Sequence, residues 1–326
     1  MKENFEFLSS NKGLIFPSFY LFIIKSLFIY ILLYTTFSRT FSKDEEYKNI
    51  LNMDNVKHDF EKLVNKYKHL IKHEENIPED SPIWMMWYQG IEKAPPIVLS
   101  CIQSVIENRA NHPVIIITKN NLKKYIKLPY YIIKKFKEGM FDVTHFSDII
   151  RMALLHKYGG YWIDSTYLIT APIKNYNTSF YTLKLNYCWT YDHPFINCKW
   201  SVNFMAISKN SFIANYGYNA LLYYWKKYNS VIDYFLLDYI IYIAYHKLPK
   251  FKKLITNLPY VNCRIFSLVQ ELSSEYNKLD LKCAFNKLTR GGVWVSLKNN
   301  KKTNYGYIID RYKLDFKNIN KDVSLK

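Results

Sequence analysis

Three charged side chains in one short stretch of the chain are suited to act together on a ligand. Asp148 and Arg151 are spaced i, i+3, so on a helix they share one face and can bond each other or a common ligand. Asp164 follows an apolar run, where an unpaired carboxylate would be costly to bury. One interpretation is an ion pair plus a structural turn aspartate. The presence of all three charges beside a double glycine favours the other, a ligand site.

The elements that position these charges are predicted from local capping signals. Ser147 suits the N-cap of a helix and Asp148 its first turn, and the apolar residues that follow predict a buried helix. Gly159 and Gly160 end that helix. The next three residues, YWI, form a short strand, so Asp164 lies at the carboxyl end of that strand. In open α/β sheets this edge is where ligands bind.

The same stretch carries a resemblance to a known family. SDIIRMALLHKYGGYWIDST resembles the signature of the capsular polysaccharide synthesis glycosyltransferases, relatives of the DxD-containing sugar transferases that include yeast-type α-mannosyltransferases and glucosylating bacterial toxins. The family pattern is S-D-x-x-R, a leucine-rich helix, Y-G-G, a strand and D-x-[DST]. Further similar stretches are PIWMMWYQG at 82–90, APPIVLSCIQSV, DYFLLDYII at 233–241 and FNKLT at 285–289. Together they cover about 57–290.

The resemblance implies a GT-A-like nucleotide-sugar fold, a divalent metal ion and retention of configuration. Asp164 and Thr166 are the metal ligands that it implies, with Thr166 in place of the second carboxylate of a full D-x-D motif. Hard oxygen ligands and phosphate suit Mn²⁺ or Mg²⁺. As an implied metal ligand, Asp164 is also a candidate catalytic residue. The residues implied in donor binding are Trp87, Asp148, Arg151, Gly159, Gly160 and Ser165.

Two tryptophans lie on the first expected strand, at 83–88, and point to opposite faces of it. By resemblance, Trp87 is the one that stacks on the nucleobase of the donor. The alternative is that Trp84 and Trp87 are both core residues.

Three residues in the second half of the chain are further candidates. Lys287, and Trp294 after a second glycine pair, are placed to close over the donor phosphates. Asp238 belongs to the family-like stretch 233–241. If Asp238 faces a cleft, we expect it to bond an acceptor hydroxyl or to act on the leaving group. An interpretation of equal weight is that Asp238 is a core carboxylate hydrogen-bonded to a tyrosine.

The order of expected elements predicts an α/β fold with a mostly parallel central sheet and crossover helices. A helix from Pro95 to about Glu107 follows the first strand, the run VIIIT gives a second strand, and a helix starts at Leu122. Later elements are extra strands within 179–207 and helices at 214–228 and 231–245.

The N-terminal part of the chain differs in composition from the rest. Residues 14–37 are apolar with a single charge at Lys25, which predicts a membrane-spanning or interfacial helix. The expected organisation is an anchor at 1–42, a helical adjunct at 43–78, a GT-A-like domain at 79–312 and a polar tail at 313–326. We expect a membrane-associated protein with a cytoplasmic catalytic domain.

Charge and cysteine content restrict the partners and the compartment. The net charge of +18 favours an anionic partner such as a nucleotide or a membrane surface. The basic residues are spread along the chain without an RNA-binding or zinc-finger signature, so no nucleic-acid partner is expected. The cysteine number is odd, at five, and no pair has C-x-x-C spacing, which predicts reduced thiols in a cytosol.

With the resemblance, these features predict a glycosyltransferase that moves a hexose from a nucleotide diphosphate sugar to a capsular or lipid-linked glycan. The alternative is a catalytically degenerate relative that binds a glycan or an assembly partner at the membrane. Thr166 supports that alternative, because it removes a carboxylate from the implied metal site.

Overall fold

The computed structural model describes residues 53–72, 74–186, 198–261, 263–276, 283–316 and 319. The predicted anchor at 14–37, the first part of the predicted adjunct and most of the predicted tail lie outside these ranges. Within them, no helix combines the length and the apolar composition that a membrane crossing requires.

A five-stranded sheet with the order β2-β1-β3-β7-β5 forms the centre of the fold. β1 pairs in parallel with β2 and β3, whereas β7 is antiparallel to both β3 and β5. Four strands therefore run in one direction and β7 opposes them, which confirms the predicted α/β fold with a mostly parallel sheet. The strands are β1 (Ile83–Met86), β2 (Val114–Ile117), β3 (Gly160–Ile163), β5 (Phe180–Thr182) and β7 (Phe204–Ile207).

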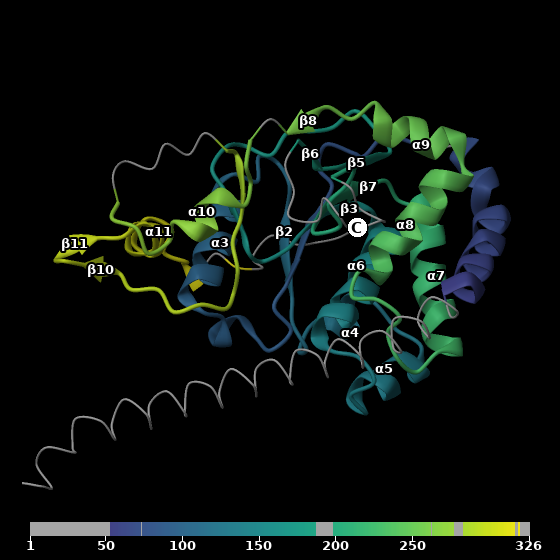
Figure 1. The fold of residues 1–326 in the computed structure, drawn as a ribbon, viewed down its shortest axis with the longest axis horizontal. Helices are drawn as coiled ribbons and strands as arrows, with labels where there is room; N and C mark the ends of the chain where they lie inside the picture. The colour runs from purple at the N-terminus through teal and green to yellow at the C-terminus, as the bar shows by residue number, and fades with distance from the viewer. Residues whose placement is uncertain are drawn as a thin grey trace, which may run out of the picture. The chain divides into compact units, whose positions relative to one another are not determined.

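Helices cover both faces of this sheet because its strands are apolar on both sides (Figure 1). Ile83 and Met85 of β1 belong to a core that also contains residues of α3 and α11. Trp84 points to the opposite face, where its ring packs 5.3 Å from Tyr158 at the end of α6. The helices are α3 (Pro96–Glu107) and α11 (Asn304–Arg311) on one side, with α6 (Val143–Tyr158), α7 (Phe212–Lys227) and α8 (Leu236–Lys247) on the other.

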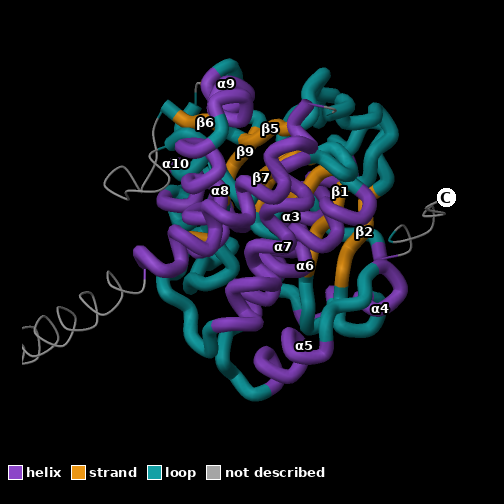
Figure 2. The backbone as a smooth tube through the Cα atoms, turned by 90° about the vertical axis from the view of Figure 1, so that its right-hand side faces the viewer, coloured by secondary structure: helices purple, strands orange, loops and turns teal. Residues whose placement is uncertain are grey.

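Shorter elements complete the described part of the chain. Figure 2 shows α5 and α9 at opposite ends, with the strands between them in the interior. Residues 53–67 are helical, as the sequence predicts, and Phe60 packs 6.4 Å from the ring of Tyr224 in α7. The others are η1 (Lys68–Lys72), η2 (Ile91–Lys93), α4 (Leu122–Tyr125), α5 (Tyr130–Lys137), β4 (Tyr167–Ile169), β6 (Lys184–Leu185), α9 (Pro249–Thr256), β8 (Tyr260–Val261), α10 (Ser267–Gln270), β9 (Phe285–Lys287), β10 (Leu297–Lys298) and β11 (Lys301–Lys302).

The central helix α6 begins earlier than predicted. Its N-cap is Asp142, whose carboxylate accepts hydrogen bonds from the backbone N–H groups of Thr144 and His145 at 3.0 Å each. Ser147, the predicted cap, lies inside the helix, because Asp142 caps equally well and no breaker separates the two positions. The predicted end is confirmed, since Gly159 terminates the helix with a φ of 69°.

The helix predicted at 231–245 begins later, at Leu236. Asp233 accepts a hydrogen bond from the backbone N–H of Phe235 at 2.6 Å, which stabilises a turn instead of a helical start. The segment that contains Tyr234 is therefore a loop in front of α8.

The prediction of reduced cysteines is wrong for three of the thiols. Cys263 and Cys283 form a disulfide with a Cα–Cα distance of 5.6 Å, and Cys198 is also disulfide-bonded. The chain that follows β8 runs beside β9, where the backbone N–H of Lys287 donates to the carbonyl of Ile265 at 2.7 Å. This tertiary pairing brings the two cysteines together, and their spacing in the sequence gave no signal for it.

Candidate active site

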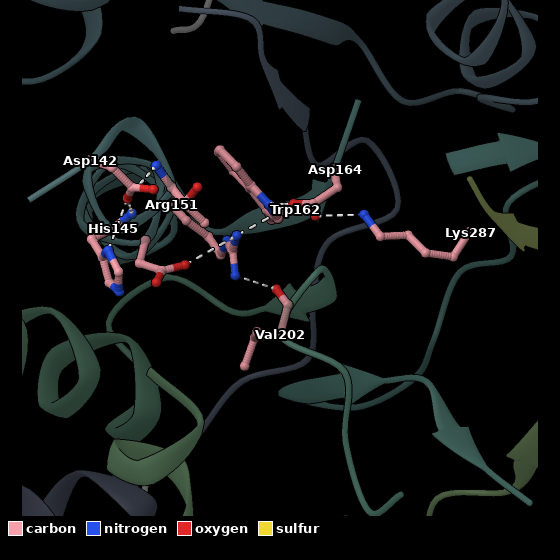
Figure 3. Close-up of polar contacts among 9 residues, drawn as sticks. Asp142, His145, Arg151, Trp162, Asp164, Val202 and Lys287 are labelled. Carbon is pink, nitrogen blue, oxygen red and sulfur yellow. Dashed lines mark hydrogen bonds and ion pairs between the residues drawn. The ribbon is translucent and has the colours of Figure 1, made fainter. Parts of the chain in front are cut away.

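Asp164 lies immediately after β3, at the carboxyl end of that strand, as predicted. Its Oδ1 accepts hydrogen bonds from Nε1 of Trp162 at 2.9 Å and from Arg151 at 3.3 Å. Its Oδ2 accepts from the ammonium of Lys287 at 2.8 Å. Figure 3 shows Asp164 between these two cations, with Arg151 and Lys287 on opposite sides of it. The carboxylate is therefore held by contacts from three elements of the fold.

Arg151 connects α6 to both sides of the site. It is 4% exposed, and its guanidinium donates to the carbonyl of Val202 at 2.7 Å. The same group forms an ion pair with Asp148 at 3.2 Å, which confirms the predicted i, i+3 pair. The guanidinium carbon also lies 4.9 Å from the ring centroid of Trp162. A planar cation with several donors fits such a set of contacts, and a lysine would not.

Lys287 reaches the site from β9, whose antiparallel pairing with β4 places it opposite Tyr167. Its ammonium donates to Oγ1 of Thr166 at 2.6 Å as well as to Asp164. It also lies 5.2 Å from the ring centroid of Tyr167. Lys287 thus bridges Asp164 and Thr166, the two residues that the family resemblance assigned to a metal ion.

Asp238 lies in the first turn of α8 and is 3% exposed. Its Oδ1 accepts a hydrogen bond from Nε1 of Trp200 at 3.0 Å. The hydrogen-bond partner of Asp238 is thus a tryptophan, where one interpretation of the sequence expected a tyrosine, and the residue lines a cavity.

Burial and neighbouring charges shift the pKa values of Asp148, Asp164 and Asp238 to different extents. Burial raises the pKa of Asp238 to about 8, and the negative charge of Asp148 acts in the same direction. Burial also raises the pKa of Asp148 to about 6, and the charge of Arg151 offsets this only in part. Burial opposes ionisation of Asp164 too, but the charges of Lys287 and Arg151 outweigh it and hold that pKa below its ordinary value. Near neutral pH the site therefore holds one protonated acid beside two carboxylates.

These side chains meet in one open cavity of 310 Å³. The predicted residues that line it are Asp148, Arg151, Asp164, Asp238 and Lys287. Residues that sequence reasoning missed are Thr144, Leu185, Trp200, Ser201, Val202, Asn203, Tyr234, Phe235 and Phe266. Of these, only Tyr234 and Phe235 lie within a family-like stretch, 233–241, that could have indicated them.

The two tryptophans predicted to contact the donor do not line this cavity. Trp87 is half-buried against the core, and its indole N–H has no hydrogen-bond partner among the described residues. The ring of Trp294 lies 5.8 Å from that of Tyr305. Trp84, in contrast, is a core residue, as one interpretation of the sequence expected, and donates to the carbonyl of Gly159 at 2.9 Å.

Three other residues predicted to bind the donor do not line the cavity and instead support the backbone around it. They are Gly159, Gly160 and Ser165. A Cβ at Gly160 would lie 2.3 Å from the carbonyl oxygen of Pro82, so a glycine is needed where β3 starts beside β1. The hydroxyl of Ser165 donates to the carbonyl of Met86 at 2.8 Å. These residues hold the end of β3, and hence Asp164, in place.

The side chains at the predicted metal position do not fit a divalent ion. Asp164 is the only carboxylate of the Asp164–Thr166 triplet, and both of its oxygens already accept hydrogen bonds. An ion between Asp164 and Thr166 would meet the ammonium of Lys287, which repels it. Across the described ranges there is also no group of three or more His, Cys, Asp and Glu side chains that could hold a metal ion.

One comparison with known proteins, against a family model, agrees with the family-like stretches. Residues 33–295 match the model of a family described as "Capsular polysaccharide synthesis protein". A solved structure titled "PaToxG Glycosyltransferase" is similar, with 15% sequence identity and a TM-score of 0.40, over 63% of this chain and 83% of that one. No curated protein matches the sequence.

Proposed function

Because this chain belongs to the capsular polysaccharide synthesis protein family, we propose that it is a glycosyltransferase. It moves a hexose from a nucleotide diphosphate sugar to a capsular or lipid-linked surface glycan. The observation that supports this best is the position of Asp164 at the carboxyl end of β3, between Arg151 and Lys287 in one open cavity. Such an edge of an α/β sheet is where nucleotide ligands bind.

The proposed transfer breaks the bond between the anomeric carbon of the sugar and the donor diphosphate. Negative charge then grows on the diphosphate, and fixed cations that face it lower the barrier. Arg151 and Lys287 are those cations, and both are oriented before the donor binds by their contacts to Asp164. Asp148, ionised near neutral pH, accepts hydrogen bonds from sugar hydroxyls, and protonated Asp238 donates one to the acceptor or the leaving group.

Two further parts of this proposal have other grounds: retention of configuration rests on the family resemblance, and membrane attachment through 14–37 rests on the sequence alone. The cysteines support a proposal for the compartment. The disulfide between Cys263 and Cys283 favours an oxidising compartment for the catalytic domain over the cytoplasm, where thiols are kept reduced.

The test is release of the nucleoside diphosphate from a panel of UDP-, GDP- and ADP-sugars by the purified full-length chain. We expect one donor class to be hydrolysed slowly and transferred faster when a glycan acceptor is added. Asp164→Asn should lower release by about 100-fold or more, since Lys287 loses its carboxylate partner. Asp80→Asn, at an exposed position, serves as the matched control and should leave release unchanged.

Binding of a glycan without release from any donor would contradict the enzyme and favour the alternative, a non-catalytic binding protein. The melting temperature of each variant separates a lost contact from a lost fold.

A further inference from the structure

The ammonium of Lys287 lies between Asp164 and Thr166, the two side chains that the family resemblance assigns to a metal ion. It donates to Oδ2 of Asp164 at 2.8 Å and to the hydroxyl of Thr166 at 2.6 Å. These are the first and third positions of the triplet, and only the first is a carboxylate. The position therefore already contains a cation, which comes from the chain itself.

The fold fixes this lysine more firmly than a surface lysine. β9 pairs with β4 so that Lys287 lies opposite Tyr167, and its backbone N–H donates to the carbonyl of Ile265 at 2.7 Å. The next residue, Leu288, donates its backbone N–H to the carbonyl of Thr166 at 2.9 Å. The Lys287 side chain is 16% exposed. Both the strand and the side chain are thus held against the triplet.

The ammonium has a donor left for a ligand. An ammonium group carries three N–H donors, and Asp164 and Thr166 take two of them. Lys287 lines the cavity, so the third can reach an oxygen of a bound molecule. On the far side of Asp164, Arg151 supplies a second fixed cation. Two cations held by one carboxylate suit a ligand with two adjacent anionic groups.

We infer that Lys287 takes the place of the divalent cation in this chain and binds the diphosphate of the donor, so that transfer proceeds without a metal ion. This rests on the proposed function. As the bond between the anomeric carbon and the phosphate oxygen breaks, its electron pair goes to that oxygen, and Lys287 and Arg151 stabilise the charge. The anomeric carbon bonds to the acceptor hydroxyl oxygen, and the proton of that hydroxyl passes to the departing phosphate oxygen.

The test measures binding of UDP, GDP and ADP to the full-length chain by calorimetry, in excess EDTA and in Mn²⁺. We expect one of them to bind with the same affinity, within about threefold, in both conditions. Manganese EPR of the protein without nucleotide should show no bound ion. Binding that requires Mn²⁺ would overturn the role of Lys287 while leaving a glycosyltransferase intact. Absence of binding in every condition would overturn both.

Substitutions at Lys287 sharpen this test. Lys287→Met keeps the length but removes the charge, and should weaken nucleotide binding in EDTA by about tenfold or more. Lys298→Met, on the exposed hairpin strand β10, is the matched control and should bind as the wild type does. Lys287→Asp places a second carboxylate beside Asp164, so this variant should bind Mn²⁺ by EPR and need it for nucleotide binding. Unchanged binding by Lys287→Met would overturn the inference; if a variant does not fold, the wild-type measurement still decides.

Discussion

The indole N–H of Trp200 donates to Oδ1 of Asp238 at 3.0 Å, on the wall of the cavity that also contains Asp148. Asp238 is 3% exposed and forms no salt bridge within the described part of the chain, and the charge of Arg151 offsets the effect of burial only in part. Burial, with the charge of Asp148, raises its pKa to about 8, so the folded protein holds a proton that the unfolded chain releases at about pH 4. This carboxyl group therefore links stability to pH.

The folded protein should lose stability as pH rises. Asp148, with a pKa of about 6, contributes to the loss between about pH 4 and 6. Asp238 contributes up to about pH 8, with a slope of at most about 1.4 kcal/mol per pH unit. In Asp238→Asn the amide does not titrate, and its oxygen still accepts the hydrogen bond from Trp200. This variant should therefore show a smaller decline in the free energy of unfolding between about pH 6 and 8. Urea unfolding of both proteins across this pH range measures the free energy of unfolding.

Asp148→Asn is the comparison for that experiment, because it should flatten the decline mainly below about pH 6. If Asp238→Asn shows the same slope as the wild type between about pH 6 and 8, Asp238 is already ionised in the folded protein.

Arg151→Lys should affect both stability and transfer. The guanidinium bonds Val202, Asp148 and Asp164 at once from a buried position, and an ammonium cannot reach all three. We expect a loss of about 1–3 kcal/mol in the free energy of unfolding, mainly from the unpaired Val202 carbonyl. Donor turnover should fall by about tenfold or more. Arg311→Lys, in a surface pair with Glu107, should change neither by a measurable amount. An unchanged melting temperature for Arg151→Lys would contradict this account.

Reduction of the disulfide between Cys263 and Cys283 should destabilise the protein. The two residues are 20 apart in the sequence, and a cross-link of that span contributes about 3 kcal/mol in the chain-entropy account. The Cys263→Ser, Cys283→Ser double variant should therefore melt at a lower temperature and lose much of the wild-type sensitivity to reductant. Cys101→Ala, at a free buried cysteine, should keep that sensitivity. Titration of free thiols in the denatured, unreduced protein gives an independent count, and five reactive thiols would exclude the disulfides.

The sequence indicated the parts of the site that depend on local signals. The ion pair of Asp148 and Arg151 follows from helical spacing, and the position of Asp164 follows from a glycine turn and a short strand. The start of α6 was missed because two good capping residues lie close together, and the one farther upstream, Asp142, is used. The contact of Lys287 with Asp164 joins residues 123 apart and depends on the register of β9 against β4, which no local pattern specifies.

Gly160→Ala tests whether the close approach of β3 to β1 positions the site. Gly160 has a φ of 99°, and a Cβ there would lie 2.3 Å from the backbone oxygen of Pro82, which cannot rotate away. We expect a loss of about 2–4 kcal/mol in the free energy of unfolding, and lower donor turnover because β3 carries Asp164. Gly139→Ala is the matched control: its φ is also positive, at 74°, but nothing lies within 4 Å of the added Cβ. It should cost only the conformational strain of about 1–2 kcal/mol. Equal losses in the two variants would show that the approach of Pro82 to Gly160 adds nothing beyond backbone conformation.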